Sequence, residues 1–162
     1  MITCENYLIR DFKPKDLEEL SFEVLKFHQK VRTKYFENCN NLKTYTQKIN
    51  SVKQDLTYLI DSCDYNLCCF CKDTNKLFGF CCFRAKGEIC ENPFIFKSER
   101  FKMNSSMFSA CKDYFNSMKV LGYNEIHTTI DRKDPERYLK FLNKFYNITV
   151  KESDPIKVIF HL

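Results

Sequence analysis

Glycine and proline are scarce in this sequence, with three and four residues among 162. This scarcity leaves little room for flexible linkers or low-complexity segments. No apolar run is long enough for a transmembrane helix, so no membrane partner is expected. The first residues lack the basic and then apolar order of a signal peptide, and no internal repeat is visible. We therefore expect one domain over residues 1–162, with a buried core and a cytoplasmic location.

Cysteine is abundant by contrast, and the chain is only mildly basic. Without an export signal, the ten cysteines favour reduced thiols in a reducing cytosol over a disulfide framework. A net charge of +5 suits a partner that carries phosphates. It falls far short of the basic stripe of a nucleic-acid-binding protein, because no basic block exceeds a few residues.

Several of the cysteines lie close together, between residues 67 and 84. Cys68 and Cys71 have the C-x-x-C spacing that lets two thiolates bind one zinc ion. The polar residues 72–76 separate two short runs rich in apolar and aromatic side chains, a pattern typical of a β-hairpin. A zinc site and a buried hairpin are therefore competing interpretations of the same stretch.

The predicted hairpin register distinguishes these interpretations. A turn centred on Thr74 and Asn75 pairs Cys68 with Cys81, and it pairs the neighbouring residues accordingly. Side chains alternate along a strand, so Cys68 and Cys71 point to opposite faces. A second C-x-x-C or C-x-x-H motif is missing as well. We therefore expect metal-free thiols that pack as small hydrophobic side chains.

Hydrophobic periodicity predicts seven strands and four helices. The helices are expected at about residues 17–31, 45–61, 105–121 and 135–145, and the strands at about 6–12, 67–71, 77–84, 88–99, 124–131, 147–152 and 156–162. Pro93 cannot donate to a ladder and so marks a bulge or an unpaired position in the fourth strand. The order β-α-α-β-β-β-α-β-α-β-β is that of a mixed α/β domain with helices over a central sheet.

Three segments carry a resemblance to a known superfamily. They are YLIRDFKPKDLEEL at residues 7–20, KLFGFCCFR at residues 76–84, and a helix, glycine turn and strand at residues 105–130. In this order they resemble the opening strand and helix, the third strand and the helix to fifth strand of the GCN5-related N-acetyltransferase (GNAT) superfamily. The resemblance covers nearly the whole chain. It implies one acetyltransferase-like domain with a GNAT-like mixed central sheet flanked by helices.

The resemblance also implies a coenzyme site. The family holds the coenzyme A pyrophosphate on a Q/R-x-x-G-x-G/A loop before a helix, where unpaired N–H groups and the helix dipole attract an anion. Arg100 fills the first position of that motif, and Met103 and Ser105 stand where the family has glycine and small residues. Acetyl-CoA is therefore expected as a cosubstrate. The implied binding residues are Phe94, Ile95, Phe96, Arg100, Phe101, Lys102, Met103, Asn104 and Ser105.

Many family members place a tyrosine in the last helix as the general acid for the leaving thiolate. Leu142 occupies that position here, so Tyr138, one turn earlier, and Tyr146, one turn later, are the candidates. A thiol has a pKa of about 8.5, so a thiolate departs easily even without full proton transfer. The change to leucine is therefore compatible with activity.

Transfer to an amine also needs a base, because an ammonium has no lone pair. Glu91 on the expected fourth strand and His127 on the fifth border the cleft that the family opens between these strands. Asp131 lies at the end of the fifth strand. Glu91 is the first candidate base, and His127 is the second.

These features predict an N-acetyltransferase that moves an acetyl group from acetyl-CoA directly to a primary amine of a small molecule or a protein. The first alternative is a degenerate, non-catalytic GNAT-fold protein that acts by binding a partner. A third interpretation, a tRNA-directed acetyltransferase, draws only on the net charge and the breadth of the family. A monomer and a homodimer are both compatible with the sequence.

Overall fold

The computed structural model describes residues 4–102, 105–131, 135–152 and 155–162. The strands are β1 (Tyr7–Asp11), β2 (Tyr65–Cys71), β3 (Lys76–Lys86), β4 (Ile89–Lys97), β5 (Glu125–Ile130), β6 (Ile148–Lys151) and β7 (Ile156–His161). The helices are α1 (Leu17–Val31), α2 (Tyr45–Asp61), α3 (Ser105–Val120) and α4 (Pro135–Phe145), with 3-10 helices η1 (Pro14–Asp16) and η2 (Lys34–Cys39) on either side of α1. The predicted order of strands and α-helices is confirmed.

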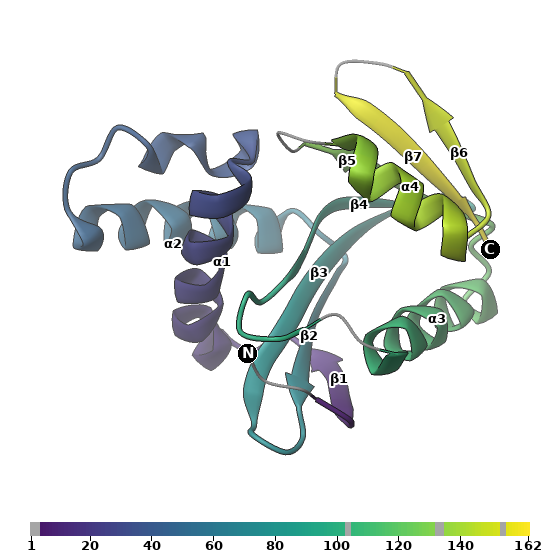
Figure 1. Cartoon of the computed structure of the whole chain (residues 1–162), viewed down its shortest axis with the longest axis horizontal. Coiled ribbons are helices and arrows are strands. Elements are labelled where there is room, and N and C mark those ends of the chain that lie inside the picture. The colour runs from purple at the N-terminus through teal and green to yellow at the C-terminus, as the bar shows by residue number, and fades with distance from the viewer. Residues whose placement is uncertain (1–3, 103–104, 132–134, 153–154) are drawn as a thin grey trace.

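All seven strands form one mixed sheet in the order β1-β2-β3-β4-β5-β7-β6. Neighbouring strands are antiparallel except β4 and β5, which are parallel because α3 carries the chain back between them. Helices α1 and α2 cover one face of the sheet, and α3 and α4 cover the other (Figure 1). The predicted mixed central sheet flanked by helices is therefore confirmed.

Two apolar cores lie on the two faces of the sheet. Cys82 of β3 packs into the core beneath α1 and α2, which includes Leu20 and Leu56. The next residue, Phe83, packs into the core beneath α3 and α4 with Leu142. Successive side chains of a strand point to opposite faces, so each face of β3 is covered by its own pair of helices.

The cysteine-rich segment forms the β2–β3 hairpin, as predicted, but the predicted register is wrong by one residue up to Cys69 and by two residues next to the turn. Cys68 pairs with Phe80 rather than Cys81. The turn is centred one residue earlier than expected, with Asn75 in the left-handed region at φ 52°. An irregularity between Cys69 and Phe70 then reduces the difference in pairing from two residues to one. Neither the turn centre nor the bulge follows from the local apolar pattern.

The faces of this hairpin agree with the prediction. Cys68 lies in the core beneath α1 and α2, whereas Cys71 lies in a separate small cluster with Cys4, Phe78 and Phe101. The two thiols of the C-x-x-C sequence therefore cannot chelate one ion.

Gly79 of β3 lies where two strands approach closely. A Cβ atom at this position would be 2.8 Å from the backbone oxygen of Phe96 on β4. Glycine is therefore required here by space rather than by backbone conformation.

No helix in the described part of the chain combines the length and the apolar character needed to cross a bilayer.

Candidate active site

β4 and β5 run side by side for only part of their length. They pair from Ile89 opposite Glu125 to Asn92 opposite Thr128, and β4 then continues to Lys97 beside β3 alone. The two strands diverge after Asn92 and Thr128, and we call the opening between them the fork. The fork exposes β4 backbone that a continuous sheet would pair.

A β-bulge in β4 lies at the start of the fork. The β3–β4 ladder leaves Asn92 and Pro93 opposite a single β3 residue, Phe83. The bulge or unpaired position predicted at Pro93 is therefore confirmed. The extra residue reverses the alternation of side chains, so Cys90 faces the core beneath α3 and α4 whereas Phe94 faces the core beneath α1 and α2.

The side chain of Asn92 holds the bulge together. It is buried, and its Nδ2 donates to the carbonyl oxygens of Cys82 at 2.8 Å and Phe94 at 3.1 Å. The hydroxyl of Thr128 donates to the backbone oxygen of Asn92 at 3.2 Å and to its Oδ1 at 3.0 Å. These bonds fix the point at which β4 and β5 part. Sequence reasoning missed both residues, because an Asn and a Thr on strands carry no distinctive pattern.

The backbone of β4 has an open edge within the fork. Ser98 donates its N–H to the carbonyl of Phe78 on β3 at 2.8 Å. Antiparallel pairs alternate between bonded and non-bonded, so Phe96 and Phe94 also bond to β3 through their backbones. Ile95 between them turns its N–H and C=O toward the fork. An extended ligand that lies along β4 would find one donor and one acceptor there.

The three predicted coenzyme residues of β4 divide by face. Phe94 and Phe96 are buried beneath α1 and α2, with ring centroids 6.1 Å apart, so their side chains cannot meet a ligand in the fork. Ile95 points to the opposite face and is 47% exposed. Of the three, only Ile95 could contact a ligand through its side chain.

The loop before α3 contains the other predicted coenzyme residues. Phe101 is fully buried, and Lys102 is exposed. Met103 and Asn104 lie outside the described residues. Ser105 is the first residue of α3 and is exposed. Lys102 and Ser105 are thus at the surface where the resemblance places the pyrophosphate.

Arg100, in the same loop, is bound to two carboxylates of α1. Its Nη2 lies 2.6 Å from Glu19 Oε1, and its Nε lies 3.1 Å from Glu23 Oε1. The hydroxyl of Ser98 donates to Glu23 at 2.6 Å and accepts the backbone N–H of Arg100 at 3.2 Å. This network attaches the loop to α1. A direct contact between Arg100 and a pyrophosphate stays a prediction, and it would compete with these ion pairs.

The candidate bases lie next to each other. Glu91 and His127 are directly opposite in the β4–β5 ladder. Both line a cavity of about 360 Å³, whose wall also includes Arg84, Lys151 and Lys157 from β3, β6 and β7. Cys90 and Ile126, which precede Glu91 and His127 in the chain, are buried beneath α3 and α4. Side chains alternate along a strand, so Glu91, His127 and the cavity lie on the opposite face of the sheet.

Glu125 is a further residue of this cavity region that the sequence analysis missed. Its carboxylate lies 2.6 Å from Nε2 of His127 and 3.8 Å from Nδ1 of His161. The hydrogen bond to His127 lowers the pKa of Glu125 below its ordinary value. A carboxylate that holds Nε2 leaves Nδ1 of His127 as the nitrogen able to accept a proton. The sequence did contain a signal for Glu125. It is two residues from His127, and this spacing places both side chains on one face of a strand.

Glu91 has a partner of a different kind. Its Oε1 forms an ion pair with Nζ of Lys86 at 2.7 Å. The carboxylate therefore shares its charge with a lysine, whereas His127 is oriented by a carboxylate. This difference makes His127 the better placed of the two bases.

The candidate acids lie on the other face of the sheet. Tyr138, Tyr146 and Leu142 belong to the core beneath α3 and α4. The ring of Tyr146 lies 5.2 Å from that of Phe115 and 5.5 Å from that of Phe160, and burial raises the pKa of Tyr146. The structure therefore brings the two candidate bases together and places both tyrosines on the opposite face of the sheet from them.

Asp131, at the end of β5, has a structural partner. Its Oδ2 accepts the backbone N–H of Lys34 at 2.6 Å. This bond ties the first residue of η2 to the end of β5, so the segment after α1 lies at the open end of the fork.

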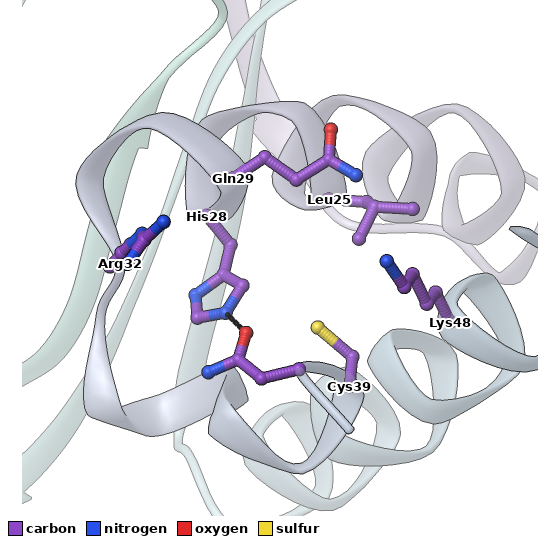
Figure 2. A pocket seen from close by; sticks show the side chains of 7 residues that line it. Leu25, His28, Gln29, Arg32, Cys39 and Lys48 are labelled. Atoms are coloured by element: carbon purple, nitrogen blue, oxygen red, sulfur yellow. Dashed lines mark hydrogen bonds between the residues drawn. The ribbon is translucent and has the colours of Figure 1, made fainter. Parts of the chain in front are cut away.

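A second cavity, of about 330 Å³, lies between α1, η2 and α2 (Figure 2). The side chains of Cys39 and Lys48 point toward it. His28 donates from Nε2 to Asn40 Oδ1 at 2.8 Å, and its Nδ1 lies 3.3 Å from the hydroxyl of Thr33. Both nitrogens of this buried histidine therefore have partners within the protein. The cavity shares no lining residue with the one beside the fork.

No family model matches this sequence, and no curated protein matches it either. Solved structures do match over nearly the whole chain. The PaiA N-acetyltransferase of Thermoplasma acidophilum, in complex with coenzyme A, has a TM-score of 0.64 at 12% identity, covering 97% of this chain and 99% of that one. The ribosomal-protein-S5-alanine acetyltransferase of Vibrio fischeri has a TM-score of 0.62 at 12% identity, covering 96% and 92%.

An acetyltransferase of the GNAT family from Bacillus anthracis has a TM-score of 0.61 at 16% identity, covering 98% of this chain and 95% of that one. At such identities the likeness concerns the fold. The chain therefore has the fold of the GNAT superfamily.

Proposed function

We propose that this protein is an N-acetyltransferase that moves an acetyl group from acetyl-CoA directly to a primary amine of a small molecule or a protein. The observation that carries the proposal is the fork, where an open backbone edge of β4 lies beside the paired residues Glu91 and His127. The matching structures support it, because they are acetyltransferases and one of them contains coenzyme A.

The donor fits the fork and the start of α3. Acetyl-CoA supplies an activated acetyl group as a thioester. Its extended arm carries amide groups, for which the backbone of Ile95 offers a donor and an acceptor. Its diphosphate suits the N-terminus of α3, where the helix dipole and the charge of Lys102 attract an anion. Arg100 holds this loop against α1 through its ion pairs with Glu19 and Glu23.

The acceptor reaches the fork from the cavity on the other face. His127, oriented by Glu125, takes the proton of the ammonium at Nδ1, and the neutral amine then attacks the acetyl carbonyl. A C–N bond forms, the C–S bond breaks, and the electron pair leaves with the sulfur. The second proton lost by the amine nitrogen passes to the thiolate, which leaves as the thiol of coenzyme A. A thiolate needs little help to leave, which fits a leucine at position 142. Tyr138 and Tyr146 stay as candidate acids.

Coenzyme binding tests this proposal before any acceptor is known. At about 100-fold above Kd, acetyl-CoA should add roughly 2.7 kcal/mol of stability. For a chain of this length that raises Tm by about 5–10 °C. Lys102→Ala should reduce the shift, whereas Lys43→Ala, which removes an exposed lysine between η2 and α2, should not. The absence of a shift with both acetyl-CoA and CoA at millimolar concentration would contradict the proposal.

The base assignment has a separate test. His127→Gln should lower turnover and remove the limb of the pH profile that reports deprotonation of the base. Glu91→Gln is the matched variant on the facing strand, and it should keep that limb. Loss of that limb in Glu91→Gln, together with its retention in His127→Gln, would assign the role of base to Glu91 instead.

A non-catalytic GNAT-fold protein is the second candidate. Leu142 favours it, because it replaces the tyrosine that the family uses beside the coenzyme sulfur, and the ion pairs of Arg100 would compete with a pyrophosphate. The retained arginine itself and the complete strand order oppose it. An unchanged Tm with acetyl-CoA, together with tight binding of a protein, would select it. Binding of tRNA with a steep dependence on salt would instead select the nucleic-acid-directed enzyme.

A further inference from the structure

The N-terminal segment of the chain lies beside the turn of the β2–β3 hairpin. The β1–β2 ladder ends with Tyr7 opposite Cys71, and Lys72 then donates its N–H to the carbonyl of Asn6 at 3.0 Å. The residues before β1 therefore run alongside the residues after β2. This arrangement brings Cys4 next to Cys71, although the two are far apart in the sequence.

Cys4, Cys71 and Asp73 form a compact set of metal-ligand groups. The two sulfurs and a carboxylate oxygen of Asp73 all lie within 4.8 Å of one another. Sγ of Cys71 is 3.9 Å from Oδ2 of Asp73. In the described part of the chain, this is the one group of three or more histidine, cysteine or acidic side chains with such geometry.

The separations between these ligand atoms are close to those found around a bound zinc ion. With zinc–sulfur bonds of about 2.3 Å, the ligand atoms of a tetrahedral site lie roughly 3.5–4 Å apart. The separation of Cys71 and Asp73 already falls in this range. The set would have to contract by about 1 Å at most, which rotation of short side chains can supply.

The surroundings favour thiolate ligands on one side and water on the other. Cys4 is 1% exposed and Cys71 is 0% exposed, and both pack with Phe78 and Phe101. Asp73 is exposed, so the set is open to solvent on its side. A fourth ligand could therefore be a water molecule, as in zinc sites with three protein ligands.

Both thiols have hydrogen-bond acceptors in the metal-free chain. Sγ of Cys4 donates to the backbone oxygen of Asn6 at 2.6 Å, and Sγ of Cys71 donates to Asp73. Binding of a cation would release both protons, because zinc binds thiolates.

We propose that Cys4, Cys71 and Asp73 bind one Zn²⁺ ion, which clamps the N-terminal segment to the β2–β3 turn. Two thiolates with one carboxylate suit zinc, whereas magnesium and calcium prefer oxygen ligands alone. The proposal departs from the expectation that the cysteines are metal-free, which was argued from the geometry of the hairpin that carries Cys68 and Cys71. The partner of Cys71 is the distant Cys4 instead.

Cobalt substitution tests the site directly. The reduced, metal-free full chain is titrated with Co²⁺ and then with Zn²⁺. We expect a thiolate-to-cobalt charge-transfer band and tetrahedral d–d bands that saturate at one ion per chain and disappear when Zn²⁺ is added. Binding should strengthen with rising pH, because the thiols must lose their protons.

Variants show which side chains bind the ion. Cys4→Ser and Cys71→Ser should each weaken binding by at least about 100-fold, more than the loss of a supporting residue usually does. Asp73→Asn should keep the charge-transfer band with weaker binding. Cys68→Ala, which removes the other thiol of the C-x-x-C, should bind as the wild type does, and its far-UV circular dichroism checks that it is folded.

Three results would overturn the proposal. The first is the absence of a thiolate band at micromolar Co²⁺. The second is a band that survives Cys4→Ser but is lost in Cys68→Ala, which would place the ion on the C-x-x-C pair. The third is a Cys4–Cys71 disulfide found by mass spectrometry in the native chain. None of these results bears on the acetyltransferase proposal, which has its own coenzyme test.

Discussion

The two halves of β4 adjoin in the chain but differ in strand pairing and in the face on which their side chains are buried. From Ile89 to Asn92 the strand is paired on both edges, by β3 and β5. From Phe94 to Lys97 it is paired on one edge only. Cys90 of the first half is buried beneath α3 and α4, whereas Phe94 and Phe96 of the second half are buried beneath α1 and α2.

This comparison shows how one strand can stabilise the fold and still offer a binding edge. In the second half, Phe94 and Phe96 fill a core, and Ile95 between them leaves its backbone polar groups to the fork. Packing depends on the side chains of alternate residues, and binding depends on the backbone of the residue between them. Stability and ligand affinity should therefore respond to different substitutions.

Among the substitutions that test this division between packing and binding, Phe94→Ala should have the largest effect on stability. The Phe94 ring lies 5.1 Å from that of Phe36, with Tyr35 and Phe27 further around it. Its removal should lower the free energy of unfolding by about 3–5 kcal/mol, measured by urea denaturation. Ile95→Ala, the neighbouring and half-exposed position, should cost less than about 1 kcal/mol. Equal losses in the two variants would contradict the division.

Asn92→Ala should come next, because it removes the side chain that joins the two halves. The carbonyl oxygens of Cys82 and Phe94 would each lose a donor. We expect a loss of about 1–3 kcal/mol in unfolding free energy. Thr128→Val removes only the hydroxyl and should cost roughly 1 kcal/mol. A larger loss in Thr128→Val than in Asn92→Ala would show that the strands are held at the fork in another way.

Ile95→Pro should affect binding more than stability. Proline removes the N–H that faces the fork and leaves the bonds of Phe94 and Phe96 to β3 in place. Affinity for acetyl-CoA, measured by calorimetry, should fall by up to about tenfold, the value of one hydrogen bond. Ile95→Ala keeps the N–H and serves as the control. An unfolded Ile95→Pro variant would mean that this N–H bonds within the sheet.

Glu125→Gln should have the smallest effect on stability, and only at acidic pH. The pKa of Glu125 is lowered in the folded protein, so its contribution is complete above the ordinary pKa of a glutamate and is lost as pH falls through the folded value. The wild type should therefore lose slightly more Tm than the variant between about pH 5 and pH 3. Parallel Tm curves over this interval would show that the carboxylate does not pair with His127 in solution.

The order of the elements was predictable because helical and strand periodicity acts over a few residues. The bulge at Pro93 was predictable for the same reason, since a missing N–H is a local property. The hairpin register was not, because its turn centre and the bulge at Phe70 depend on how β2 packs against the rest of the sheet. The error of one to two residues in pairing left Cys68 and Cys71 correctly assigned to opposite faces, because alternation within β2 does not depend on the partner strand.

The candidate site was predictable only in part. The resemblance placed Glu91 and His127 on adjacent strands, and the ladder pairs them directly. It also proposed Arg100 for the coenzyme, because sequence shows a charge but not its partners. In the fold, two carboxylates of α1 reach this guanidinium.

The sequence by itself thus determined the succession of helices and strands and the break in β4. Only the tertiary structure decided which distant side chains meet, such as Arg100 with Glu19, Asn92 with Thr128, and Cys71 with Cys4. The physical reason is the range of the interactions. Periodicity and turn preferences are set by neighbouring residues, whereas strand pairing and helix docking join segments from opposite ends of the chain and depend on the packing of the whole.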